Sequence, residues 1–464
     1  MRKLFVLILL IACSTASTAF ADEMIDLKEQ IKELTQTVKS LKSTVEDLKS
    51  KDEARQREIN ALKGIPSKTS MPAGATTQDQ IQAMDEKVNK VIEAQKKVLP
   101  SEFNPAIGLV GETVFSHSSR GSNKTGSDRP GGFDINQRSV ELNLAASVDP
   151  FATGYAVINA SADADSGEAT LAVEEAALQT TSLPENLTLK AGRFFAEFGR
   201  LAYIHDHELP FVNRPLVLDQ YIGGESQTDG AQISWLVPMD QYVNISAGVG
   251  EKFGSPLNHV GDLRTGGELN YWGRASTYFE LTPDWQIETG ISGMINPKTS
   301  GRGGALARPD GSTLTEQARR LGGMDFSLRW VPLRNNQFQS FTWGTEILFS
   351  DNRYLFDPNA TPGDGDEFGN SISSHGLYSY VAYKIDRQWT AGLAYDFVEN
   401  LTNENDQTNA YSIFLTYALS HWNQLRLEYT HTDRDPVSGL QDNDAIYLQW
   451  TWIIGSHSHG WQQR

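Results

Sequence analysis

The 464-residue chain has one cysteine, no long apolar segment and few basic residues for its number of acidic ones. The lone Cys13 excludes a disulfide scaffold and a zinc ribbon, which need several cysteines. No apolar run approaches the roughly 18 residues of a transmembrane helix, so a multi-spanning helical membrane protein is excluded. Residues 101–464 contain 24 basic and 44 acidic residues, a net charge of −20. That charge argues against nucleic acid as a partner.

Residues 1–21 have the pattern of a secretory signal peptide. Two basic residues precede an apolar run over 4–12, and the tripeptide Ala-Phe-Ala at 19–21 offers small residues at the cleavage positions. The alternative is a lipobox-like Leu-Ile-Ala-Cys ending at Cys13, which would make that cysteine a lipidated N-terminus. Both alternatives export the chain from the cytoplasm.

Residues 22–63 carry apolar side chains at alternating steps of three and four, the pattern of a coiled coil. One seam position is mostly β-branched and the other is leucine, which favours a dimer, whereas a trimeric following domain would favour a trimer. Residues 64–78 are rich in Pro, Gly, Ser and Thr and predict a flexible linker, and residues 79–100 predict a short helix. The seam residues are Met24, Ile31, Val38, Val45 and Ile59 at one position and Leu27, Leu34, Leu41, Leu48 and Leu62 at the other.

From residue 101 to residue 464 the apolar period changes to two. Alternation of apolar and polar side chains is typical of a sheet with one apolar and one wet face. Sixteen such runs are centred near residues 110, 143, 158, 174, 191, 234, 246, 275, 291, 327, 345, 380, 394, 415, 428 and 449. They predict an all-β transmembrane barrel of about sixteen antiparallel strands.

The connections between these runs alternate between short turns and mostly longer polar loops, among them 196–227 and 399–408. Such asymmetry is typical of bacterial outer-membrane barrels, and aromatic residues at strand ends would form the interfacial girdles. A soluble sandwich or propeller explains the alternation but not the loop asymmetry. The girdle residues are Phe115, Phe151, Tyr155, Trp235, Tyr242, Phe279, Trp285, Trp330, Trp389, Trp422 and Trp452.

Segment 189–199, LKAGRFFAEFG, resembles the G-[RQ]-F-x-x-x-F-G segment of phosphate-selective-porin-like outer-membrane channels. With the acidic pair Glu174-Glu175 and the later His205 and His207, the longer pattern is similar to porin-like proteins often described as zinc-regulated or TonB-dependent receptors. The resemblance implies an outer-membrane barrel with a periplasmic coiled coil. A genuine TonB-dependent receptor needs a plug and about twenty-two strands, for which residues 101–464 are too few.

Charged residues out of phase with the apolar stripe are expected to line the barrel. A sixteen-stranded barrel is too wide for wall side chains to fill, so an aqueous pore is predicted. Six acidic against three basic residues predict a mild cation preference, and no basic ladder suited to phosphate is present. The residues are Glu141, Arg274, Glu280, Glu288, Asp325, Arg329, Glu346, Arg426 and Glu428.

The long loop 196–227 is the candidate constriction, because a charged loop inside a barrel can select solutes by size and by field. The alternative is an outward-facing surface loop. The residues assigned to the constriction are Arg200, His205, Asp206, His207 and Arg214.

No metal site, cofactor or catalytic residue is predicted. His205 and His207 are good zinc ligands, but the sequence identifies no third ligand beside them. The acidic run 364–367 lacks the spacing of a twelve-residue calcium loop, and the two terminal-tail histidines, His457 and His459, are weaker candidates still. No serine has the context of a catalytic nucleophile, so an enzyme is not expected.

The sequence therefore predicts an outer-membrane porin-like channel for passive diffusion of small polar solutes or ions. It would be a homotrimer surrounded by outer-membrane lipid and lipopolysaccharide, with its coiled coil in the periplasm. Two alternatives stay open. One is a receptor that captures a ligand such as a metal chelate, and the other is a barrel whose coiled coil is tethered to peptidoglycan.

Overall fold

The computed structural model describes residues 105–120, 131–162, 168–254, 265–299, 305–307, 311–332, 338–361, 363, 365–434 and 442–455. The chain divides into two units, Met1–Gln95 and Lys96–Arg464, and all described residues belong to the second. The predicted signal peptide, coiled coil, linker and short helix lie outside the described residues. No helix in the described part of the chain is long and apolar enough to cross a membrane.

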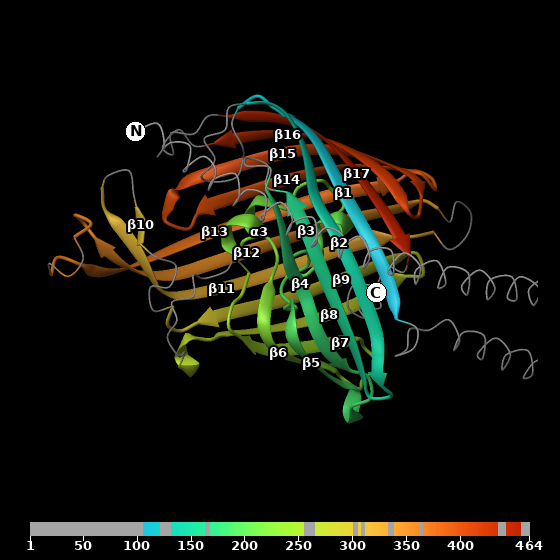
Figure 1. Ribbon diagram of the computed structural model, residues 1–464, viewed down its shortest axis with the longest axis horizontal. Helices are drawn as coiled ribbons and strands as arrows, with labels where there is room; N and C mark the ends of the chain where they lie inside the picture. Colours follow the sequence, from blue (N-terminus) through green and yellow to red (C-terminus); the bar gives the residue numbers. More distant parts are fainter. Residues whose placement is uncertain are drawn as a thin grey trace, which may run out of the picture. The chain divides into compact units, whose positions relative to one another are not determined.

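The second unit is a closed antiparallel barrel of sixteen strands, as the sequence predicts (Figure 1). Strands that follow one another in the chain pair with one another, and β1 closes the barrel by pairing with β17 from Gly108↔Gly455 to Ser118↔Ala445. Among the described residues, the unexpected β10 pairs only with the start of β11, while β9 pairs with β11 directly, so β10 is an appendage to the wall.

Each of the sixteen predicted centres falls within one wall strand. The strands are β1 (Ala106–Ser118), β2 (Gly132–Asp149), β3 (Ala152–Ala162), β4 (Ala169–Thr180), β5 (Leu187–Phe195), β6 (Gln227–Leu236), β7 (Val243–Gly250), β8 (Asn270–Thr282), β9 (Trp285–Asn296), β10 (Ala305–Ala307), β11 (Thr313–Trp330), β12 (Ser340–Asp357), β13 (Phe368–Lys384), β14 (Trp389–Asn400), β15 (Asn403–Ser420), β16 (Asn423–Arg434) and β17 (Asn443–Gly455). The helices are η1 (Pro184–Asn186), η2 (Asp206–Glu208), α3 (Leu216–Tyr221) and η3 (Gly266–Glu268).

The prediction of a long loop at 399–408 is wrong. β14 ends at Asn400 and β15 begins at Asn403, so the connection is a tight hairpin. The first residues of β15 are polar on both faces, and a strand without an apolar face carries no period-2 signal. From the sequence alone, such a polar stretch predicts a loop.

Large apolar side chains face outward along the wall. Ile291, Met324 and Ile413 are 59%, 61% and 56% exposed, whereas the next residues Asp325 and Phe414 are 3% and 1% exposed. An apolar outer belt is what a lipid-embedded barrel presents to the bilayer.

Aromatic rings reinforce both the belt and the interior. The ring centroids of Trp285 and Trp330 lie 6.3 Å apart, and those of Trp389 and Tyr417 lie 4.6 Å apart. Tyr155 was assigned to the outer girdle, but it is buried inside the barrel and donates its hydroxyl to Glu175 at 3.1 Å. Its position in β3 is out of phase with the outward-facing Gly154 and Ala156, so its side chain faces the interior.

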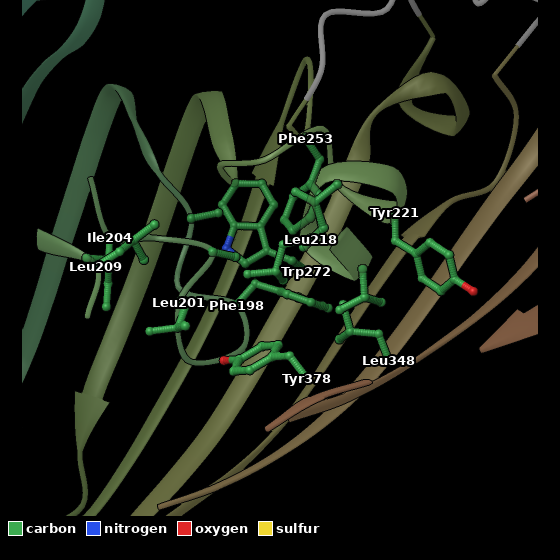
Figure 2. Close-up of a cluster of buried hydrophobic side chains, with 14 of the residues drawn as sticks. Phe198, Leu201, Ile204, Leu209, Leu218, Tyr221, Phe253, Trp272, Leu348 and Tyr378 are labelled. Atoms are coloured by element: carbon green, nitrogen blue, oxygen red, sulfur yellow. The ribbon is translucent and has the colours of Figure 1, made fainter. Parts of the chain in front are cut away.

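The interior is not lined by charged side chains alone. A buried hydrophobic cluster lies inside the wall, formed by the segment between β5 and β6 together with inward-facing wall residues (Figure 2). This is where the core of the fold sits. The labelled members are Phe198, Leu201, Ile204, Leu209, Leu218, Tyr221, Phe253, Trp272, Leu348 and Tyr378.

Candidate functional site

Residues 196–226, which we call the inner segment, connect β5 to β6 and lie against the inner wall of the barrel. The segment contains η2 and the single-turn helix α3, which Pro215 precedes at its N-cap. Gly199, Gly223 and Gly224 have positive φ, so the chain turns sharply at both ends. Its apolar residues supply 11 of the 25 buried residues of the hydrophobic cluster, including six of the ten labelled in Figure 2.

One end of the inner segment is attached to β9 and β12. The Gly199 N–H donates to Ser292 Oγ at 3.0 Å, and the Arg200 N–H donates to Glu346 Oε2 at 3.1 Å. The Arg200 side chain forms an ion pair with Glu288 of β9 at 3.0 Å. Polar wall side chains thus accept hydrogen bonds from backbone N–H groups of the segment, which would otherwise be buried without partners.

The middle of the segment is attached to β16 and β2. The Val212 N–H donates to Glu428 Oε2 at 2.6 Å, and Arg426 Nη1 donates to the Phe211 carbonyl at 2.9 Å. Arg138 Nη2, from β2, donates to the Val212 carbonyl at 2.8 Å. The middle of the segment is therefore held by β2 and β16, which lie far from β9 and β12 in the sequence.

Helix α3 packs against β13 and β14. The Tyr221 hydroxyl donates to the Glu399 carbonyl at 3.0 Å, and the Tyr221 carbonyl accepts from Arg319 of β11. Together these contacts fix the inner segment across the lumen rather than at its rim.

Arg214 organises the segment internally. Its guanidinium donates to the carbonyls of Leu201 and Ile204 at 2.7 and 2.6 Å, to Asp206 at 2.8 Å and to Glu225 at 3.2 Å. Arg214 is only 7% exposed. Because the acceptors of this buried guanidinium all belong to the inner segment, Arg214 stabilises the conformation of that segment.

His205 and His207 face an acidic patch on β2 and β4. His205 Nε2 is hydrogen-bonded to Glu175 Oε1 at 3.1 Å, and His207 Nδ1 to Glu141 Oε1 at 3.2 Å. The two imidazoles stack with centroids 5.7 Å apart. Burial alone would lower the pKa of both histidines, but the charge of Glu141 and the hydrogen-bonded carboxylates outweigh it and raise the pKa of each above its ordinary value.

Two β-bulges supply extra side chains to this face. The register between β3 and β4 shifts between Val157 and Ile158, which leaves Glu174 opposite no partner residue. The register between β1 and β2 shifts in the same way at Arg138. A bulge re-aims a side chain that the strand would otherwise place on the other face. Glu174 accordingly approaches His205, and Arg138 approaches the inner segment.

The structure places the nine predicted wall residues on inward-facing positions, but with unequal exposure. Glu288 is half-buried, and Glu280 and Arg329, near the short-turn ends of β8 and β11, are exposed. The other six are buried beneath or beside the inner segment and are Glu141, Arg274, Asp325, Glu346, Arg426 and Glu428.

All five residues assigned to the constriction belong to the inner segment. Arg200, His205 and His207 contact the wall, whereas Asp206 and Arg214 pair with each other. Their part in a constriction stays a prediction.

Sequence reasoning missed Arg138 and did not assign Glu174 and Glu175 to the lining. Consecutive acidic residues within an otherwise alternating strand were the one available signal of the bulge.

Comparison with known proteins supports the fold. No protein-family model matches the chain. An uncharacterised protein of Aquifex aeolicus (strain VF5) is 28% identical over 355 residues, which cover 70% of this chain and 69% of that protein. The high-pH structure of Pseudomonas putida OprB has a TM-score of 0.51 at 7% identity and covers 75% of this chain and 94% of that one. The outer-membrane channel DcaP of Acinetobacter baumannii has a TM-score of 0.50 at 10% identity and covers 77% of this chain and 99% of that one. The chain shares the fold of these outer-membrane barrels.

Proposed function

We propose that this protein is an outer-membrane channel for the passive diffusion of small polar solutes or ions. The observation that carries the proposal is a closed sixteen-stranded barrel with an apolar outer belt and a charged segment fixed across its lumen. The fold likeness to outer-membrane barrels supports the location in the outer membrane. A homotrimer, and contacts with lipopolysaccharide and peptidoglycan, stay predictions of the sequence.

In this proposal the inner segment is the constriction, and the solute route is the space between it and the wall. Solvent-exposed Glu280 and Arg329 and half-buried Glu288 are polar groups on the inner face that water reaches. Side-chain charges at a narrow, poorly screened passage set ion preference. The excess of acidic residues favours cations, which departs from the anion preference that the phosphate-selective-porin resemblance would imply.

The test is planar-bilayer conductance of the purified, detergent-folded protein in a tenfold KCl gradient. We expect stepwise openings and a reversal potential of the sign for cation preference. The Glu280→Gln/Glu288→Gln variant should move that potential toward zero. Asp351→Asn is the matched control, because Asp351 is an acidic residue on the outer face that pairs with Arg320 at 3.1 Å. A heat-modifiable, folded barrel that never conducts would overturn the open-channel proposal.

A ligand-gated receptor is the second candidate. It is favoured by the apolar packing of the inner segment, since a segment with buried Phe198, Leu218 and Tyr221 closes more of the lumen than a polar loop at the rim. This candidate expects a folded barrel that stays closed until a ligand is added, and a conductance change that saturates with ligand concentration.

A further inference from the structure

A set of metal-ligating side chains converges where the inner segment meets β2 and β4. One ligand atom from each of Glu141, Glu174 and His205 lies within 4.8 Å of the others. His205 Nδ1 lies 3.6 Å from Glu141 Oε2 and 3.7 Å from Glu174 Oε1. From these contacts we infer that Glu141, Glu174 and His205 bind a divalent transition-metal ion, Zn²⁺ being the best match to the donor set.

The distances match a shared ion better than direct hydrogen bonds. A N–H···O bond usually measures about 2.7–3.2 Å between heavy atoms, shorter than either separation. Two ligands bound tetrahedrally at about 2.1 Å from zinc lie roughly 3.4 Å apart. The three groups therefore need only small side-chain movements to ligate one ion. Three protein ligands leave a fourth position for water.

The surrounding hydrogen bonds orient the ligands as a metal site requires. His205 Nε2 is bonded to Glu175 Oε1 at 3.1 Å, so the proton of a neutral ring sits on Nε2 and the lone pair of Nδ1 points at Glu141 and Glu174. His207 bonds the other oxygen of Glu141, which leaves Oε2 of that carboxylate directed toward His205. Partners of this kind beyond the ligands are a regular feature of protein metal sites.

The charge and burial of these side chains explain why a cation would bind between them. Glu141 and His205 are each 2% exposed, and the Glu174 side chain is 11% exposed. The second carboxylate oxygen of Glu174, Oε2, is buried and has no hydrogen-bond partner among the described residues. Glu175 adds a third carboxylate to the same place. Buried carboxylates so close together repel one another unless a positive charge lies between them.

A bound ion would have a structural effect besides its own binding. It would join the inner segment to β2 and to the bulge of β4, opposite the attachments to β9 and β12. The rival arrangement is a protonated His205 that holds the carboxylates by charge alone. The two differ in one measurable respect, because the rival binds no metal.

The experiment is a Co²⁺ titration of the EDTA-treated, refolded full-length barrel, followed by visible absorption, with Zn²⁺ as competitor and elemental analysis for stoichiometry. We expect one ion per chain and the intense d–d bands of a four-coordinate site. Glu174→Gln and His205→Asn should weaken binding more than Glu175→Gln, for which a loss of about 10–100-fold is expected.

Two controls make the outcome decisive. His375→Ala removes an outward-facing histidine that pairs with Glu399 at 2.8 Å, and it should leave binding unchanged. The double variant His457→Ala/His459→Ala tests chelation by the terminal tail and should also leave metal binding unchanged.

A folded wild-type barrel that takes up no Co²⁺ or Zn²⁺, or Co²⁺ binding that survives Glu174→Gln, would overturn the inference. The conservative Glu174→Gln variant keeps the test valid should His205→Asn fail to fold. Metal binding is read without any conductance, so it stands or fails independently of the proposed channel.

Discussion

The Val212 N–H donates to Glu428 Oε2 at 2.6 Å across 216 residues of sequence. A carboxylate that accepts a backbone N–H forms one of the stronger hydrogen bonds available inside a protein. The contact ties the middle of the inner segment to β16, the strand whose Arg426 also donates to the Phe211 carbonyl. Glu428 is also 2% exposed, so little water competes for it.

Glu428→Ala should free the middle of the inner segment. Removing the acceptor leaves the Val212 N–H buried without it, at a cost of about 1–3 kcal/mol. We expect larger and noisier single-channel conductance in planar bilayers. Asp351→Ala, at an outer-face position where Asp351 pairs with Arg320 at 3.1 Å, is the control and should leave channel noise unchanged. Identical traces for Glu428→Ala and wild type would show that this contact does not limit the passage.

Gly199→Ala should destabilise the start of the inner segment. Gly199 has φ +59°, and a Cβ there would lie 1.9 Å from Glu346 Oε1, the carboxylate that also accepts the Arg200 N–H. Strain and displacement should cost about 1–3 kcal/mol in the free energy of unfolding. Gly311→Ala is the matched control, because Gly311 has φ +86° but open space around the added Cβ. Urea unfolding in lipid vesicles measures both, and equal losses would contradict the role given to the Glu346 contact.

Asp325→Asn should be costly, because it leaves Arg274 as an unpaired buried cation. Arg274 Nη2 donates to Asp325 Oδ1 at 3.0 Å, and the two side chains are 4% and 1% exposed. Breaking one partner of a buried ion pair typically costs about 3–5 kcal/mol, whereas replacing both partners by apolar residues costs far less. The double variant Arg274→Met/Asp325→Leu should therefore recover most of the loss in the same unfolding assay. Equal instability of single and double variants would refute this explanation.

Arg214→Met should unfold the inner segment while leaving the wall intact. The variant removes the donors to the Leu201 and Ile204 carbonyls and leaves Asp206 without its guanidinium. Limited proteolysis of the folded barrel should then cut within the inner segment, and wild type should resist. Arg320→Met is the control, since the Arg320–Asp351 pair is about half exposed and contributes little. Resistance of Arg214→Met to the protease would contradict the organising role of this arginine.

The strands could be predicted from the sequence because each one carries its own signal. Val140, Leu142 and Leu144 alternate with polar residues whatever the rest of the chain does. An even count of such strands, joined by alternating short turns and longer loops, then predicts the closed barrel. The signal fails where a strand is polar on both faces. This is why the hairpin between Asn400 and Asn403 was expected to be a long loop.

The candidate site was predictable only in part, because its contacts join distant segments. The inner segment is recognisable by its length and charge, yet His205 meets Glu175 and Glu141 only once β2, β3, β4 and β5 have paired side by side. The bulge at Glu174 depends on the register of β3 and β4, and its one local sign is the pair of consecutive acidic residues Glu174 and Glu175. The hydrophobic cluster was equally hidden, since Leu218 and Trp272 are ordinary apolar residues until the fold places them inside the barrel (Figure 2).

The wide spread of attachment points has a consequence for the order of assembly. The Glu428 carboxylate that accepts the Val212 N–H lies on β16, one of the last strands in the chain, whereas the inner segment itself lies between β5 and β6. Joining residues so far apart in the sequence carries a large loop-closure entropy cost until the intervening chain is ordered. We therefore expect the wall strands to pair first and the inner segment to reach its contacts on β16 last. A barrel arrested before that step would have all its strands paired and a lumen unlike that of the finished protein.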